Sequence, residues 1–135
     1  MFTDQLRHVA IFQGCSRAEL QRIARQSEAR QLAVGTTIVT EGQSGSEFFV
    51  IIDGTARVSR QGRRVTTLER GDAFGELALL GKAPRNATIV AETDVEVLVV
   101  GEHAFVELLD EVPGFALKLL RNTARRLREA DAHAI

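Results

Sequence analysis

Hydrophobic residues recur at helical spacing near the N-terminal end of the chain. Residues 3–28 read as helical, because their apolar positions repeat every three or four residues. Ser16 followed by Glu19 is the capping-box pattern, which predicts that a second helix starts there. The residues between the two helices, 11–15, carry apolar side chains and a glycine. We therefore expect a turn that packs against the rest of the domain.

The pattern changes between residues 31 and 100, where short β-branched and aromatic runs alternate with Gly, Asp and Ser. The dipeptides Asp53-Gly54 and Gln61-Gly62 are typical hairpin tips. The expected strands are residues 30–34, 37–41, 47–52, 55–60, 63–68, 87–91 and 95–100. Many short strands at nearly even spacing favour an antiparallel β-roll or jelly-roll barrel.

Helical spacing returns after residue 100. Residues 102–109 are expected to form one helix, and Pro113 stands at a typical first position of a longer helix that runs to about residue 130. The apolar stripe of the long helix consists of Phe115, Leu119, Leu120, Thr123, Ala124 and Leu127. Its basic residues are Arg121, Arg125, Arg126 and Arg128. Arginines on an amphipathic helix more often form a solvated face than a nucleic-acid site.

Length and composition fit one domain. A chain of 135 residues can bury a core, and no repeat, low-complexity segment or flexible linker divides it. We expect N-terminal helices in residues 1–30, a β-roll in residues 31–100 and C-terminal helices in residues 101–135. The fold class is therefore mainly β with flanking helices. The initiating methionine favours a native N-terminus, although a larger regulator could contain the same domain.

Charge and hydropathy exclude several classes of function. The formal net charge of −1 gives no overall field that would draw the chain to nucleic acid or to an anionic membrane. No apolar run reaches the roughly 18 residues of a membrane span, and no secretory signal opens the chain. The single cysteine, Cys15, excludes an internal disulfide and fits a reducing cytosol. We expect a cytoplasmic protein with no membrane partner and no nucleic-acid partner.

The candidate chemistry lies in residues 71–91, where Glu76 and Arg85 stand nine positions apart among apolar and small residues. A carboxylate can accept hydrogen bonds from sugar hydroxyls. A guanidinium can grip a phosphate through two parallel hydrogen bonds. The pair predicts a pocket for a sugar phosphate.

The backbone around this pair is also suited to an anion. Gly75 and the short side chains of Ala78 and Ala87 leave backbone N–H groups open to a ligand. Residues 76–80 could form a single helical turn whose N-terminal N–H groups point at the same anion. Both features strengthen the prediction of a phosphate site.

This region resembles the phosphate-binding cassette of cyclic nucleotide-binding domains, the family of the protein kinase A regulatory subunit and the bacterial catabolite activator protein. The matching stretches are Phe74-Gly75-Glu76-Leu77-Ala78-Leu79-Leu80 and Pro84-Arg85-Asn86-Ala87-Thr88. Upstream, residues 41–45 and 48–54 resemble the glycine-marked hairpin of the family. From the residues alone, these glycines mark turns that need a positive φ or close packing, and we favour a purely structural role for them.

The resemblance implies a ligand and a role for each cassette residue. In the family the glutamate binds the ribose 2′-hydroxyl and the arginine binds the cyclic phosphate; here these are Glu76 and Arg85. Asn86 could bond the phosphate or a guanine amino group, or neither. The expected ligand is cAMP, with cGMP as the alternative, and neither a cofactor nor catalysis is expected. The predicted ligand-binding residues are Phe74, Gly75, Glu76, Leu77, Ala78, Arg85, Asn86 and Ala87.

The chain departs from the family pattern where the base would bind. Residues 113–131 align with the long central helix of the catabolite activator, but its adenine-contacting Thr-Ser pair falls here on Ala130 and Asp131. The chain has no Trp and no Tyr that could stack on a base. The remaining candidates for a base contact are the helix arginines, Asn122, Thr123 and Leu127.

Other classes of function find less support. Gly81-Lys82 is not a Walker A motif, because Ala83 stands where Ser or Thr must bind magnesium. The three histidines are scattered, without the spacing of metal ligands. Two alternatives stay open. One is an interaction module that kept the fold and lost the ligand, and the other is a dimerisation fragment whose residues 113–130 pair with a second copy.

The resemblance also implies regulation. The long C-terminal helix is expected to shift when the pocket fills, which requires that nucleotide binds one helix position better than the other. A homodimer through this helix and an effector protein or domain are the expected partners, and the sequence does not identify the effector. The catabolite-activator-like helix favours a bacterial origin.

Overall fold

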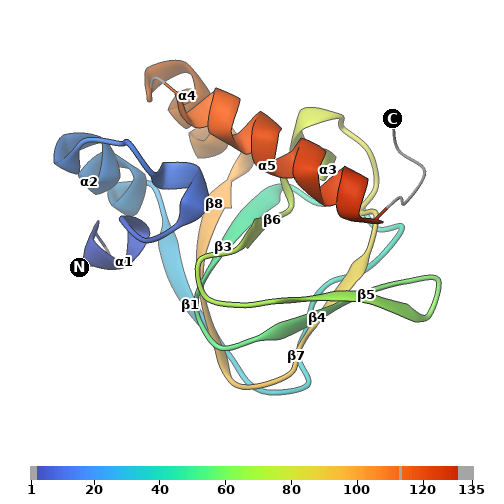
Figure 1. Cartoon of the computed structure of the whole chain (residues 1–135). Helices are drawn as coiled ribbons and strands as arrows, with labels where there is room; N and C mark the ends of the chain where they lie inside the picture. The colour runs from blue at the N-terminus through green and yellow to red at the C-terminus, as the bar shows by residue number, and fades with distance from the viewer. Residues whose placement is uncertain (1–2, 113, 131–135) are drawn as a thin grey trace.

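The computed structural model describes residues 3–112 and 114–130, which form a β-roll with helices packed against one side (Figure 1). The strands are β1 (Glu28–Leu32), β2 (Thr37–Val39), β3 (Glu47–Asp53), β4 (Ala56–Arg60), β5 (Arg63–Leu68), β6 (Ala73–Phe74), β7 (Thr88–Ala91) and β8 (Val95–Gly101). The helices are α1 (Thr3–Leu6), the 3-10 helix η1 (Ala10–Phe12), α2 (Arg17–Arg25), α3 (Glu76–Leu80), α4 (Glu102–Glu111) and α5 (Phe115–Ala130). The predicted fold class, mainly antiparallel β with flanking helices, is confirmed.

The strands form two four-stranded antiparallel sheets, with the orders β1-β8-β3-β6 and β2-β7-β4-β5. The predicted hairpin tip at Gln61-Gly62 is confirmed, because it joins the paired strands β4 and β5. The one predicted at Asp53-Gly54 is wrong: this turn joins β3 to β4, which belong to different sheets and do not pair. Gln61 and Gly62 both have positive φ, as a tight hairpin turn requires, and Gly54 has a φ of 90° in the turn between the sheets. Every expected strand region contains a strand, although β1 lies two residues earlier than the expected 30–34. Strand β2 ends at Val39, because the backbone turns at Thr40, whose carbonyl accepts from Gln43 N–H at 3.1 Å.

Strand β6 was not predicted. It consists of two residues, Ala73 and Phe74, which pair with Val50 and Phe49 of β3. Two residues are too short to show an alternating pattern in a sequence. The strand matters because it leads directly into the cassette helix α3.

Strand β3 separates two apolar cores. Phe48, Val50 and Ile52 belong to the core beneath the helices. Phe49 and Ile51 point the other way, into the interior of the β-roll. Because side chains alternate across a strand, one continuous apolar run serves both layers.

The N-terminal segment packs against the helix-side core. The capping box that opens α2 is confirmed: Ser16 Oγ accepts from Glu19 N–H at 3.1 Å, and Ser16 N–H donates to Glu19 Oε1 at 2.8 Å. The expected turn at residues 11–15 instead begins within η1. Its large apolar side chains, Ile11 and Phe12, are buried against the domain as predicted, and the Phe12 ring lies 5.4 Å from the Phe115 ring of α5.

Helices α4 and α5 cover the same core. Phe115, Leu119 and Thr123 of α5 are buried. The predicted apolar stripe was too wide, because Leu120 and Ala124 are exposed to solvent. The buried positions 115, 119 and 123 lie four residues apart, on one narrow face of the helix, so only part of the apolar stripe is covered. The side chain of Leu127 lies outside the described part of the structure. The predicted helix start at Pro113 lies outside the described residues, and so does Asp131.

None of the helices in the described ranges is long and apolar enough to cross a membrane.

Candidate functional site

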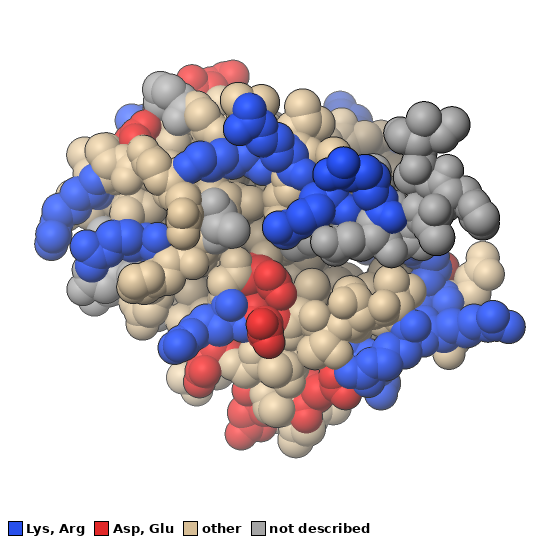
Figure 2. All heavy atoms as spheres, in the orientation of Figure 1, with Lys and Arg blue, Asp and Glu red and all other residues tan. Residues whose placement is uncertain are grey.

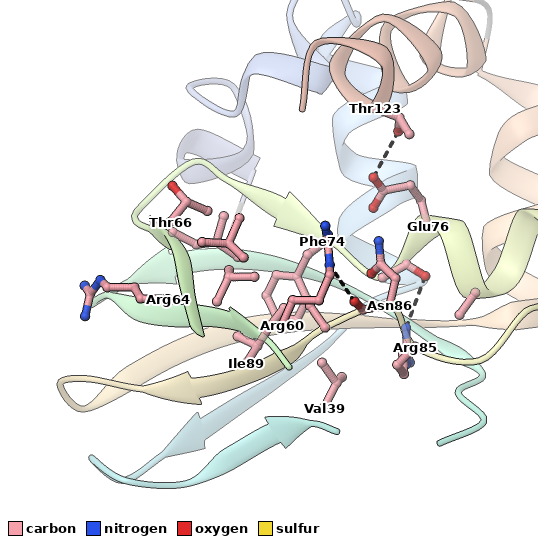
Figure 3. A pocket seen from close by; sticks show the side chains of 16 residues that line it. Val39, Arg60, Arg64, Thr66, Phe74, Glu76, Arg85, Asn86, Ile89 and Thr123 are labelled. Atoms are coloured by element: carbon pink, nitrogen blue, oxygen red, sulfur yellow. Dashed lines mark hydrogen bonds between the residues drawn. The ribbon is translucent and has the colours of Figure 1, made fainter. Parts of the chain in front are cut away.

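A cavity of about 580 Å³ opens between the β4–β5 hairpin, the cassette and α5 (Figure 3). Its walls combine the apolar interior of the roll with a few charged and polar groups. The lining residues are Val39, Val58, Arg60, Arg64, Val65, Thr66, Leu68, Phe74, Gly75, Glu76, Ala78, Arg85, Asn86, Ala87, Ile89 and Thr123. A concave apolar site with a small number of convergent polar groups is typical of small-molecule binding.

Arg85 lines this cavity and is almost fully buried, with 7% of its surface exposed. Its Nη1 donates to the carbonyl of Gly75 at 3.1 Å, and its Nη2 donates to the carbonyl of Glu47 at 2.9 Å. The guanidinium carbon also lies 5.8 Å from the centroid of the Phe49 ring, within range of a cation–π interaction. These contacts hold the planar group in one orientation.

The charge of Arg85 is not neutralised by a close carboxylate. Within the described ranges, no Asp or Glu forms an ion pair with this guanidinium. Burial lowers the pKa of Arg85, while the more distant carboxylates of Glu47 and Glu76 act to raise it. A guanidinium has five N–H donors and stays protonated. A buried cation with unused donors is suited to an anionic ligand.

The backbone of Arg85 is held by the loop that follows β2. Arg85 N–H donates to the Gln43 carbonyl and Gly42 N–H donates to the Arg85 carbonyl, both at 2.8 Å. One step further, Glu41 N–H donates to Thr88 Oγ1 at 3.0 Å. The loop therefore fixes the chain on both sides of the arginine.

Glu76 is the second buried charge of the cavity, with 2% of its surface exposed. Its Oε1 accepts a hydrogen bond from Thr123 Oγ1 of α5 at 2.9 Å, as the dashed line in Figure 3 shows. Gly75, with a φ of 100°, lets the chain turn from β6 into α3 and brings Glu76 beneath α5. The cassette and the C-terminal helix are thus joined inside the cavity.

Two arginines of the β4–β5 hairpin, Arg60 and Arg64, also line the cavity. Arg60 Nε donates to the Asn86 carbonyl at 2.9 Å. Arg64 makes a two-pronged ion pair with Glu92, through contacts of 2.8 and 3.1 Å. Figure 2 shows Lys and Arg side chains gathered over α5 and again at the β4–β5 hairpin. Because the cavity lies between these two elements, positive charge flanks it and favours the approach of an anion.

The structure brings nearly all the predicted site residues together. Phe74, Gly75, Glu76, Ala78, Arg85, Asn86 and Ala87 all line the cavity. The side chain of Leu77, the eighth predicted residue, lies outside the described part of the structure. Their contacts with a ligand stay a prediction. Of the residues proposed for a base contact, Thr123 lines the cavity and bonds Glu76, whereas Asn122 accepts a hydrogen bond from Arg125.

The β4–β5 wall of the cavity was not predicted from the sequence. Arg60, Arg64 and Thr66 carried no motif, and their strands predicted only a hairpin. The alternation of residues along β5 predicts that every second side chain faces the interior of the roll. It does not predict which part of that interior remains an open cavity. The described part of the chain holds no group of three or more His, Cys, Asp or Glu side chains placed to bind a metal ion.

Comparison with known proteins gives a consistent result. A family model described as the cyclic nucleotide-binding domain matches residues 29–112. The chain is 38% identical over 132 residues to a cAMP-dependent protein kinase regulatory subunit of Mycosarcoma maydis, covering 91% of this chain and 25% of the relative. It is 40% identical over 116 residues to the same kind of subunit from Colletotrichum orbiculare, covering 84% of this chain and 30% of the relative. The chain therefore spans between a quarter and a third of these relatives.

Solved structures agree in fold. A structure of cAMP-bound PfPKA-R superposes with a TM-score of 0.90 and 32% identity, covering 98% of this chain and 46% of that one. The catabolite activator protein of Thermus thermophilus superposes with a TM-score of 0.84 and 30% identity, covering 91% of this chain and 60% of that one. The two curated relatives are fungal, whereas the catabolite activator protein is from Thermus thermophilus. The expected bacterial origin of this chain therefore stays a prediction.

Proposed function

This chain belongs to the cyclic nucleotide-binding domain family, and we propose that its cavity binds cAMP, in preference to cGMP, as a regulatory signal. The observation that carries the proposal is the environment of Arg85. A buried guanidinium is held on two backbone carbonyls, without a carboxylate in ion-pair range among the described residues. Burying a cation in this way is costly unless a ligand compensates it. A cyclic phosphate supplies the missing negative charge.

Glu76 is the proposed partner of the ribose. Its carboxylate lines the same cavity as Arg85, so a ligand that carries a sugar and a phosphate in one rigid ring could engage both. A carboxylate accepts two hydrogen bonds readily, so it could take the ribose 2′-hydroxyl while Thr123 donates to Oε1. The backbone N–H groups of the cassette, predicted to assist, would complete the phosphate site.

The base is proposed to lie toward the β4–β5 wall. Val58, Leu68 and Ile89 make this part of the cavity apolar, as a purine face requires. The preference for adenine over guanine rests on the relatives, which are cAMP-dependent subunits and a cAMP-bound structure. Asn86 is exposed and does not decide between the two bases.

Helix α5 is the proposed moving part. Thr123 of this helix donates a hydrogen bond to Glu76, the carboxylate that would bind the ribose. The environment of that hydrogen bond would therefore differ between the occupied and the empty site. A shift follows only if nucleotide binds one position of the helix better than the other. Amide hydrogen exchange in residues 102–130 should therefore differ between the cAMP-bound and the nucleotide-free protein, and equal exchange would contradict the shift.

Partners of this domain are proposed from its relatives and from its surface. The curated relatives are regulatory subunits of cAMP-dependent protein kinases, which makes a protein kinase the first effector class to test. Leu117 and Leu120 of α5 are exposed, with 51% and 64% of their surface open. They are the residues through which the predicted homodimer would pair, and light scattering distinguishes that dimer from a monomer. A cytoplasmic location and a non-catalytic role stay predictions.

Calorimetric titration of nucleotide-free protein with cAMP and cGMP tests the proposal. Because the chain has no Trp or Tyr, absorbance near 260 nm verifies that bound nucleotide has been removed. We expect saturable binding of cAMP at micromolar concentration or tighter, about 8 kcal/mol or more, and weaker binding of cGMP. Folded, verified nucleotide-free protein that takes up neither nucleotide would point instead to an interaction module that lost its ligand.

A further inference from the structure

The loop after β2 passes unusually close to the side chain of Arg85. A Cβ placed on Gly45 would lie 1.9 Å from Arg85 Nε, 2.2 Å from Cζ and 2.3 Å from Nη2. Contacts this short overlap completely, so no side chain at position 45 can coexist with the guanidinium where it now lies. The arginine occupies space that every other residue type would fill.

The backbone at Gly45 does not itself require glycine. Gly42 in the same loop has a φ of 85°, and Gly75 on the other side of the guanidinium has a φ of 100°; both are left-handed conformations that favour glycine. Gly45 is not among the residues with a positive φ. An alanine could adopt its backbone conformation without strain, so the absence of a side chain at this position serves the neighbour and not the turn.

The atoms that crowd position 45 lie at the end of a long side chain and not in the backbone. The three heavy atoms nearest to the added Cβ all belong to the guanidinium end of Arg85. A long side chain can rotate away at small cost, whereas a backbone or a packed ring cannot. A methyl group at position 45 would therefore displace the guanidinium and leave the fold in place.

Such a displacement would remove the contacts that orient Arg85. The guanidinium would leave the Glu47 and Gly75 carbonyls, which hold it through hydrogen bonds of 2.9 and 3.1 Å. A bidentate grip on a phosphate depends on the direction of the planar group as well as on its charge. The loop residue would thus control the phosphate site without touching the ligand.

We propose that Gly45 is a positioning residue for ligand binding. Because Gly45 has no side chain, the Arg85 guanidinium has the space to lie where it bonds the Glu47 and Gly75 carbonyls. The inference rests on the proposed phosphate-binding function, because it assigns the effect of Gly45 to the arginine of that site. It replaces the purely structural role predicted from the sequence for this glycine.

The variant Gly45→Ala tests the proposal, with Gly101→Ala as the matched control. Gly101 has a φ of −68°, and a Cβ added there meets no atom within 4 Å. We expect Gly45→Ala to weaken cAMP binding by about tenfold to a hundredfold, the range for losing charge-assisted hydrogen bonds, while its melting temperature stays close to that of the wild type. Gly101→Ala should bind cAMP as the wild type does.

A double variant shows whether Gly45 acts through Arg85. In an Arg85→Ala background, Gly45→Ala should cause no further loss of affinity, because the group that it displaces is absent. Equal losses in both backgrounds, or wild-type affinity of Gly45→Ala, would overturn the proposal. If Gly45→Ala unfolds the protein, Arg85→Ala should restore the fold; unfolding in both backgrounds would also overturn it.

A readout without nucleotide separates this inference from the proposed function. The Nε–H resonance of Arg85, identified by its loss in Arg85→Ala, should shift in nucleotide-free Gly45→Ala and stay unchanged in Gly101→Ala. An unchanged resonance in a wild type that binds cAMP would overturn the role of Gly45 alone. A shifted resonance in a protein whose wild type binds no cyclic nucleotide would overturn the function alone and leave the positioning role in place.

Discussion

The two faces of strand β3 show how one element serves stability and binding at once. On the helix side, Phe48, Val50 and Ile52 join a closed apolar core under α2, α4 and α5. On the roll side, Phe49 and Ile51 join a second core that borders the 580 Å³ cavity with its two buried charges, Arg85 and Glu76. A filled layer contributes stability, whereas an unfilled layer that contains charge sacrifices stability for a ligand site.

The largest expected effect is a loss of stability on the helix side. Phe105 is buried between the rings of Phe48 and Phe115, at centroid distances of 5.0 and 6.2 Å. Phe105→Ala removes a large buried ring, so we expect the free energy of unfolding of the nucleotide-free protein to fall by about 3–5 kcal/mol. Urea denaturation measures this, and cAMP titration of the remaining folded protein should show an affinity within a few-fold of the wild type. A large loss of affinity would show that the two faces are not independent.

On the roll side, the largest effect should be on binding. Arg85→Ala removes the charge-assisted partner of a desolvated phosphate, so cAMP affinity should fall by about 2–5 kcal/mol. Calorimetric titration measures the loss. Arg85→Lys is the matched variant, because it keeps the charge but loses the planar two-pronged geometry, and it should recover only part of the affinity. If Arg85→Ala binds cAMP as tightly as the wild type, the assignment of the phosphate site is wrong.

A smaller effect on binding should come from Glu76. We expect Glu76→Ala to weaken cAMP binding by about 1–3 kcal/mol, because a ribose hydroxyl loses its acceptor. The matched ligand is 2′-deoxy-cAMP, which lacks that hydroxyl and should bind the variant and the wild type with similar affinity. An equal loss for both ligands would show that Glu76 does not bind the ribose.

Thr123 links α5 to the ligand site through its hydrogen bond to Glu76. Removing the hydroxyl should weaken the coupling between ligand binding and this helix. Thr123→Val keeps the shape of a residue that is 7% exposed and deletes the hydroxyl that donates to Glu76. We expect cAMP affinity to change by about 0.5–1.5 kcal/mol, the net worth of one hydrogen bond. The change in amide exchange of α5 on cAMP binding should also become smaller than in the wild type. An undiminished exchange response would mean that the helix senses the ligand by another route.

The smallest effect concerns the rim of the roll. The hydrogen bond from Arg64 lowers the pKa of Glu92 below its ordinary value. Because the folded-state pKa is depressed, the pair stabilises the fold above the ordinary carboxyl pKa of about 4.3 and loses that effect as the pH falls further. The difference in melting temperature between the wild type and Glu92→Gln should be small near neutral pH and should vanish in acid. A difference that grows in acid would contradict this sign.

The parts of the fold that follow local rules could be predicted from the sequence. Short β-branched runs marked the strand regions, Ser16 and Glu19 marked a helix start, and Glu76 and Arg85 marked a charged pocket, all of which the structure contains. These signals depend on neighbours in the chain, so they can be read without knowing the fold.

The parts that depend on contacts distant in sequence could not be predicted. Strand β6 forms because Phe74 meets Phe49, and the exposure of Leu120 and Ala124 depends on how much of α5 the roll covers. The role of Gly45 also depends on a contact that is distant in sequence. Its sequence context marks a turn, whereas its closest neighbour is an arginine forty residues further along the chain.

A crystal structure of the cAMP complex would test the central claim most directly, namely that the buried charges of the roll side form the nucleotide site. We expect a phosphate oxygen about 2.7–2.9 Å from a nitrogen of Arg85, with the ribose 2′-hydroxyl on Glu76. The guanidinium should keep its hydrogen bonds to the Glu47 and Gly75 carbonyls. A nucleotide bound elsewhere on the domain, or a phosphate that Arg85 does not contact, would show that these charges do not form the site.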